Sequence, residues 1–185
     1  MMDNIKAISN KLLIPFFVTL IGALFMFITI FLPYTTATEE QSERFKAYPD
    51  EIVYEKLDMT AKDMINISMV EYANVYGNLS EQIWGDTSYG IFYIALVALI
   101  GVFSLLSILF SVLKKPIAVI IFSLLSFGVF SIQNFDYTDR GVVPSNTYEW
   151  GTAYYAFYIA FAITFVGAIW MLVSKRIQKK QEKQA

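Results

Sequence analysis

The groups best placed to do chemistry in this sequence are carboxylates and tyrosines, because the chain contains no histidine and no cysteine. Their absence removes the commonest side-chain base and metal ligand, the thiolate nucleophile and any disulfide framework. Asp136, Asp139 and Glu149 lie with Arg140 in one short hydrophilic segment. Such carboxylates could act as general acids or bases, alone or with a metal. No catalytic, metal-binding or nucleotide-binding motif accompanies them, so the sequence predicts no catalytic residue, no metal site and no cofactor.

Aromatic residues gather on both sides of this hydrophilic segment. With the charged groups they could line a shallow vestibule that binds a cationic peptide, a lipid headgroup or a loop of a partner protein. An ordinary aromatic belt at a membrane interface, with a cap packed over it, would explain the same distribution. The Asp136 and Asp139 pair could also contribute oxygen ligands to calcium, although two aspartates at this spacing are a weak signal. The candidate vestibule residues are Trp84, Tyr89, Tyr93, Asp136, Asp139, Arg140, Tyr148, Glu149, Trp150, Tyr154, Tyr155 and Tyr158.

Four long apolar stretches must position these groups. Asp, Glu, Lys and Arg are absent from residues 12–38, 87–113, 116–135 and 150–174. Each stretch holds the roughly 20 apolar residues that a helix needs to cross about 30 Å of hydrocarbon. The sequence therefore predicts an all-α membrane protein: one domain over residues 1–185, a four-transmembrane-helix antiparallel bundle. The predicted spans are 12–33, 89–113, 116–135 and 150–174.

Charge counting predicts the orientation. The N-terminal segment, the Lys114-Lys115 turn and the tail at 175–185 hold nine basic and two acidic residues, a net charge of +7. The loops at 34–88 and 136–149 hold five basic and fourteen acidic residues, a net charge of −9. Cytoplasmic loops of membrane proteins carry the excess of Lys and Arg. We expect both termini in the cytoplasm and both acidic loops outside. The excess of lysine over arginine suggests a bacterial cytoplasmic membrane.

The long outer loop is predicted to form a helical extracellular cap. Thr60-Ala-Lys-Asp63 has the form of a capping box, with Asp in place of Glu or Gln, and introduces an apolar face at helical spacing that ends near Gly77-Asn78. Pro49-Asp50-Glu51 could start a second, shorter helix through Leu57.

Small residues mark the expected contacts between the spans, because lipid supplies no hydrophobic drive between helices and close approach must supply packing. These contacts could lie within one bundle, or they could join copies of the chain or a membrane partner. The predicted helix-packing residues are Gly101, Ser104 and Ser111 in the second span and Ala153, Ala156, Ala160 and Gly167 in the fourth.

Two resemblances follow from this layout. Four spans with a long first and a short second outer loop resemble the claudin arrangement in topology only. Trp84-Gly85 is the segment most similar to the claudin Gly-Leu-Trp element, and the claudin cysteines are missing. The segments Phe31-Leu-Pro-Tyr34 and Asp139-Arg-Gly-Val-Val-Pro144 are similar to small four-span membrane proteins of low-GC Gram-positive bacteria. That resemblance implies no activity and no site residue.

The leading functional hypothesis is a non-enzymatic accessory, sensor or scaffold protein that works through its acidic, tyrosine-rich outer face. Its expected partners are membrane lipid and a larger membrane protein or further copies of the chain, with no nucleic acid. An active transporter is disfavoured because the spans lack the mid-membrane ionisable residues that mark ion-coupled transport. An oligomeric small-solute pore or transporter, and a membrane enzyme using outer carboxylates, remain the alternatives.

Overall fold

The structure, a computed structural model, describes residues 2–183, and the side chains of residues 2–11, Ile83 and Trp84 lie outside the description. Helices account for 76% of the protein. The helices are α1 (Met2–Ile28), α2 (Glu39–Ala47), α3 (Met69–Trp84), α4 (Ser88–Val112), α5 (Pro116–Asp139) and α6 (Thr152–Glu182), with short 3-10 turns η1 (Thr29–Phe31), η2 (Glu55–Leu57) and η3 (Asp63–Ile65). The strands are β1 (Pro33–Ala37), β2 (Ile52–Tyr54), β3 (Met59–Thr60), β4 (Asn66–Ser68) and β5 (Tyr148–Trp150).

Four helices, α1, α4, α5 and α6, are long and apolar enough to cross a membrane. This confirms the prediction of four transmembrane helices and indicates a multi-pass membrane protein. Three of them are longer than the predicted spans: α1 begins at Met2, α5 continues to Asp139 and α6 to Glu182. α1 also ends at Ile28, before the predicted end of the first span at residue 33, because β1 begins there. The extensions are polar, so the hydropathy pattern that predicts a span gives no signal for them.

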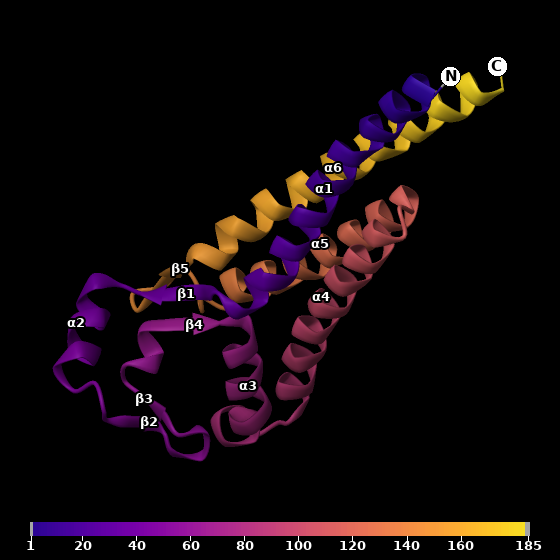
Figure 1. The fold of residues 1–185 in the computed structure, drawn as a ribbon. Coiled ribbons are helices and arrows are strands. Elements are labelled where there is room, and N and C mark those ends of the chain that lie inside the picture. Colours follow the sequence, from indigo (N-terminus) through magenta and orange to yellow (C-terminus); the bar gives the residue numbers. More distant parts are fainter. Residues whose placement is uncertain (1, 184–185) are drawn as a thin grey trace.

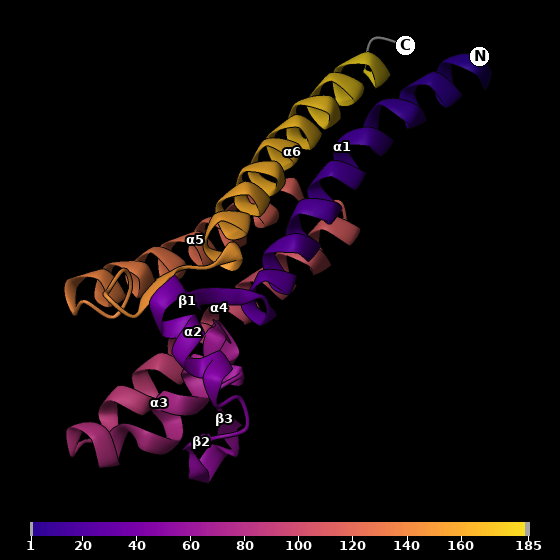
Figure 2. The same cartoon turned by 90° about the vertical axis from the view of Figure 1, so that its left-hand side faces the viewer.

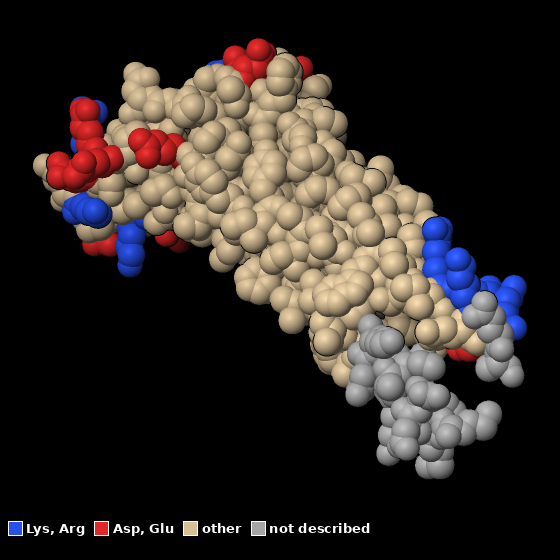
Figure 3. Space-filling model, turned by 90° about the horizontal axis from the view of Figure 1, so that it is seen from above, with Lys and Arg blue, Asp and Glu red and all other residues tan. Residues whose placement is uncertain are grey.

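The four long helices pack in a closed order. α1 contacts α4 and α6, and α5 contacts the other sides of α4 and α6. α1 and α6 run side by side to the end of the molecule that holds both termini, and they extend beyond the tip of the α4–α5 hairpin (Figures 1 and 2). Charged side chains gather at the two ends of the molecule and leave an uncharged surface between them (Figure 3). A belt without charge is the surface that a lipid bilayer requires.

The opposite end of the molecule is a folded cap, which we define as residues 33–87 and 140–151. Its centre is a three-stranded antiparallel sheet in the order β4-β1-β5. Thr36 of β1 lies opposite Asn66 of β4 on one side and opposite Glu149 of β5 on the other. The sheet thus joins the segment after the first span to the segment before the last one. A second, two-stranded sheet pairs β2 with β3.

The strands correct the all-α prediction and the purely helical cap. Each strand has two to five residues. Such short runs contain too little alternation of apolar and polar residues to be distinguished from a loop. In addition, β5 pairs with a strand more than one hundred residues away. The strands therefore depend on contacts that local sequence does not encode.

The predicted helix starts in the cap are also corrected. Thr60 does donate its N–H and its hydroxyl to Oδ2 of Asp63, at 2.9 and 2.8 Å. That turn leads into η3 and β4, and α3 begins only at Met69, capped reciprocally by Ser68 and Glu71. The expected helix from Pro49 to Leu57 is replaced by β2 and η2, while a helix that was not predicted, α2, precedes it.

Candidate functional site

Arg140 is the centre of a polar network where the cap meets the long helices. It follows the last residue of α5 and lies one turn beyond Asp136. Its Nη2 and Nε each lie 2.9 Å from Oδ2 of Asp136. Both side chains are largely shielded, with exposed fractions of 25% and 29%. A charge-assisted contact of this kind is stronger than an exposed ion pair because water competes less with it.

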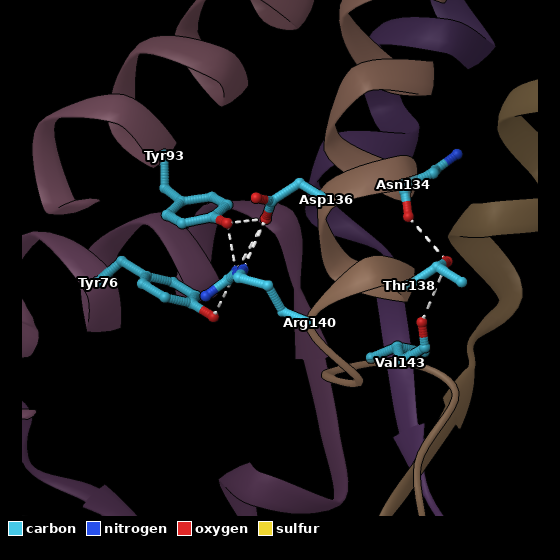
Figure 4. Close-up of polar contacts among 7 residues, drawn as sticks. All are labelled: Tyr76, Tyr93, Asn134, Asp136, Thr138, Arg140 and Val143. Atoms are coloured by element: carbon cyan, nitrogen blue, oxygen red, sulfur yellow. Dashed lines mark hydrogen bonds and ion pairs between the residues drawn. The ribbon is translucent and has the colours of Figure 1, made fainter. Parts of the chain in front are cut away.

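Two tyrosines from other helices complete this network (Figure 4). Nη2 of Arg140 donates to the hydroxyl of Tyr76 at 3.2 Å and also contacts the hydroxyl of Tyr93, which donates to Asp136. The guanidinium carbon lies 5.0 Å from the ring centre of Tyr93, 5.5 Å from that of Tyr76 and 5.7 Å from that of Tyr137. These distances are in the range of cation–π attraction. The network therefore ties α3, α4 and α5 together around one cation.

A second aromatic group lies beside the first one. Tyr34 of β1 donates its hydroxyl to Oδ1 of Asn134 at 2.5 Å, and Asn134 donates its Nδ2 to the hydroxyl of Tyr158 at 3.2 Å. Trp150 stacks on Tyr154 with ring centres 4.2 Å apart and meets the Tyr34 ring edge-on at 5.4 Å. These contacts hold the central sheet of the cap against α5 and α6.

A cavity of about 350 Å³ opens in the cap between α3 and the loop that leads to β5. Two of its tyrosines are fixed by hydrogen bonds: Tyr148 donates to the carbonyl of Met64 at 2.9 Å, and Tyr72 accepts from Thr35 at 3.0 Å. Burial raises the pKa of Tyr72, Tyr76 and Tyr148 above the ordinary value of a phenol, so all three are neutral at physiological pH. The lining residues are Tyr54, Met64, Ile67, Tyr72, Val75, Tyr76, Gly141, Val142, Ser145, Thr147 and Tyr148.

The structure brings only part of the predicted vestibule together. Tyr93, Asp136 and Arg140 meet in the Arg140 network, Trp150, Tyr154 and Tyr158 in the second aromatic group, and Tyr148 lines the cavity. Asp139 and Glu149 are exposed, as are Tyr89 and Tyr155 with exposed fractions of 45% and 58%, and the Tyr155 ring meets the Tyr154 ring edge-on with centres 5.1 Å apart. Trp84 was also predicted, and its side chain lies outside the described residues.

The surroundings of Asp136 and Asp139 give no support to the calcium site considered for them. Asp136 already binds Arg140 and Tyr93, while Asp139 is exposed. Among the described residues, no group of three or more Asp or Glu residues is placed to hold a metal ion.

Sequence analysis missed the contribution of α3 and β1. Tyr72 and Tyr76 belong to the apolar face that predicts the cap helix, but nothing in the sequence indicates that this face turns towards Arg140. α5 also carries two fully buried polar groups, the Gln133 amide and the Tyr137 hydroxyl, that have no hydrogen-bond partner within the described protein. Most buried polar groups in proteins are paired, so these two are exceptions.

The predicted helix-packing residues lie mostly on buried faces. Gly101, Ser104 and Ser111 are buried on α4, and Ala153, Ala160 and Gly167 are buried on α6, with Ala156 half-buried. The hydroxyls of Ser104 and Ser126 lie 3.0 Å apart across the α4–α5 contact.

The backbones of α1 and α6 approach each other closely at two glycines. A Cβ atom added at Gly167 would lie 2.8 Å from Oγ1 of Thr19 and 2.9 Å from its backbone N. A Cβ atom added at Gly22 would lie 2.6 Å from the backbone N of Thr164. Gly22 was not among the predicted packing residues.

The fold and the site together define a multi-pass membrane protein with a folded polar cap and an aromatic cavity. No family model matches this sequence, and neither the curated proteins nor the solved structures contain a significant match to it.

Proposed function

We propose that this chain is a non-enzymatic accessory, sensor or scaffold protein of the bacterial cytoplasmic membrane, and that its cap recognises a membrane partner. In this proposal the four long helices form an antiparallel bundle, both termini lie in the cytoplasm and the cap lies outside. The net charge of +7 at the terminal end and −9 at the cap end supports this orientation through the positive-inside rule.

The observation that carries the proposal is the tyrosine-lined cavity of the cap. A volume of about 350 Å³ suits one large side chain or a small group rather than a whole peptide. Tyr54, Tyr72, Tyr76 and Tyr148 contribute aromatic surface together with hydroxyl groups. Tyrosine is enriched in protein interfaces for this combination of large apolar area and a polar end.

The charge around the cavity indicates the kind of partner. Residues 34–88 and 136–149 at this end of the molecule carry a net charge of −9, so a basic segment approaches them more readily than an acidic one. The chain also offers an internal example, because the guanidinium of Arg140 lies against Tyr76, Tyr93 and Tyr137. A basic loop of the partner that inserts one side chain into the cavity satisfies both observations.

Co-purification in mild detergent tests the proposal. Full-length protein should recover a partner in fixed stoichiometry. Tyr148→Ala removes a wall of the cavity and should lower that recovery by at least about tenfold, the size expected of an aromatic anchor at an interface. Tyr48→Ala is the matched control, because Tyr48 is an exposed cap tyrosine that does not line the cavity.

A direct binding measurement gives the charge preference. A lysine-rich peptide titrated into the full-length protein should bind, and a glutamate-rich peptide of equal length should not. Raised salt should weaken the lysine-rich complex. A protein that is always recovered alone, or equal recovery from the two tyrosine variants, would overturn the proposal.

A further inference from the structure

A second hollow lies at the opposite end of the molecule from the cap, where the α4–α5 turn meets α6. It is a groove of about 520 Å³, and its walls are mainly apolar. Phe110, Ile117, Ile121 and Leu172 supply apolar surface, and Ile117 and Ile121 are at least half exposed. Lys114, Lys115 and Lys175 stand at the same groove. Three ammonium groups beside an exposed apolar channel form an amphipathic surface.

The turn that carries two of these lysines has an unusual conformation. The N–H of Lys115 bonds to the carbonyl of Phe110 at 2.8 Å, and the N–H of Lys114 bonds to that of Ser111 at 2.9 Å. This pair of bonds is the Schellman ending of a helix, in which the left-handed position is usually glycine. Here Lys114 occupies it with φ of +52°. A lysine therefore stands where the backbone favours a residue without a side chain, which points to a use for its charge.

The third lysine comes from a helix distant in sequence. Lys175 of α6 donates its ammonium to the backbone carbonyl of Lys114 and so lies beside the turn, while the Lys114 ammonium lies 5.5 Å from the ring centre of Phe16 on α1. The ion pairs of the described chain are Arg44 with Glu40 and Arg140 with Asp136, and neither involves these lysines. The repulsion among the three ammonium groups falls when an anion lies between them. α5 begins at Pro116, so the positive end of its helix dipole faces the same region.

We infer that this groove binds one anionic phospholipid. The phosphate would lie among Lys114, Lys115 and Lys175, and an acyl chain would follow Ile117, Ile121 and Leu172 along the uncharged surface. The turn ends two membrane-spanning helices, which puts the lysines at headgroup depth and the apolar walls at acyl-chain depth. Basic pockets between transmembrane helices on the cytoplasmic side bind anionic headgroups in this manner. The site is independent of the cap and of the partner proposed for it.

Native mass spectrometry of the full-length protein, titrated with phosphatidylglycerol or phosphatidylcholine, tests this inference. One phosphatidylglycerol should bind at least about tenfold more tightly than phosphatidylcholine, since each basic residue near anionic lipid adds appreciably to the affinity. Lys114→Gln with Lys115→Gln should abolish that preference. Lys179→Gln with Lys180→Gln makes the same charge change in the C-terminal part of α6 outside the groove and should preserve it.

Two further arms separate a lipid site from a simple anion site. Ile121→Trp fills the groove without changing charge and should weaken phosphatidylglycerol binding, whereas Ile132→Trp, on the same helix and equally exposed, should not. Inorganic phosphate at millimolar concentration should leave the lipid bound. Displacement by free phosphate, equal binding of the two lipids, or equal loss in the two double-lysine variants would each overturn the inference.

Lys114→Gly tests whether a loss of lipid binding could come from a loss of structure. Glycine accepts the left-handed conformation, so thermal stability should be unchanged or raised, while the preference for phosphatidylglycerol should fall. A variant that is at least as stable as the wild-type protein and still binds the anionic lipid with full preference would contradict a role for Lys114 in the site.

Discussion

The membrane-spanning helices and the cap are held together by different interactions. Between α1 and α6 the backbones approach so closely that even a methyl group at Gly22 or Gly167 would collide with the facing threonine. In the cap, buried tyrosines, hydrogen bonds and one shielded ion pair provide the contacts. Lipid offers no hydrophobic gain for helix association, so the helices associate through close packing of complementary surfaces. Water-facing segments, in contrast, gain stability from burying aromatic rings.

The two regions should therefore respond to different perturbations. A change in charge or pH should act on the cap and spare the helices, while a change in side-chain volume at the α1–α6 contact should do the reverse. The Arg140 network lies at the boundary, because it joins α3 of the cap to α4 and α5.

Alkaline pH should have the largest effect, and it should act on the cap. Burial raises the pKa of Tyr34, Tyr72 and Tyr76, and neighbouring tyrosines raise the pKa of Tyr34 further. A group whose pKa is raised by folding contributes its full stability below the unfolded value, near 10, and loses it as the pH rises. At pH 11, one unit above the unfolded value, each of these tyrosines can cost at most about 1.4 kcal/mol of stability.

Tyrosinate absorbance and protease sensitivity of the cap should therefore rise together above pH 10, while helix content changes little. Tyr72→Phe removes one titrating hydroxyl and should move this transition to higher pH, which separates tyrosine ionisation from deprotonation of lysines. A transition that is the same in this variant, or that melts the long helices at the same pH, would contradict the comparison.

A larger side chain at the α1–α6 contact should act on the helices instead of the cap. Gly167→Leu places atoms within 3 Å of Thr19, including its backbone N, and should destabilise the protein by about 3 kcal/mol because α1 and α6 must separate. Reversible unfolding in mixed detergent micelles measures this change. Gly128→Leu on α5 is the control: a Cβ atom there has nothing within 4 Å, so the stability should change by less than about 0.5 kcal/mol. Equal effects of the two leucines would show that close backbone approach does not hold α1 to α6.

The same contrast explains what the sequence could predict. The four spans follow from the missing charges alone, because a charged side chain in hydrocarbon is costly wherever the rest of the chain lies. Pro116 likewise marks the start of α5 from local rules. The strands of the cap could not be predicted, since Pro33–Ala37 becomes a strand only when Asn66–Ser68 and Tyr148–Trp150 lie on its two sides.

The candidate site was predictable in part, since Tyr93, Asp136 and Arg140 were all predicted for one vestibule and meet in the Arg140 network. Asp136 and Arg140 are one helical turn apart, and a pair at this spacing is expected to interact. Tyr76 contacts the same arginine from a helix 64 residues away, and no periodicity reports that distance. Tyr155 was predicted together with Tyr154, and the two rings meet edge-on with centres 5.1 Å apart although Tyr155 is 58% exposed.

The third and smallest effect concerns the boundary between the two regions. Arg140 and Arg44 both pair with a carboxylate one turn earlier, but the Arg140 pair is shielded while the side chains of Arg44 and Glu40 are 69% and 78% exposed. Arg140→Gln leaves Asp136 and the tyrosine hydroxyls without their common cation and should cost about 2 kcal/mol, in the range for hydrogen bonds to charged groups. Arg44→Gln should cost less than about 0.5 kcal/mol, because exposed pairs contribute little.

Near-ultraviolet circular dichroism should also fall only in the Arg140 variant, since its guanidinium lies against three tyrosine rings. Equal and small effects would mean that the network is only a surface contact, and that the cap is held to the helices by its aromatic packing alone.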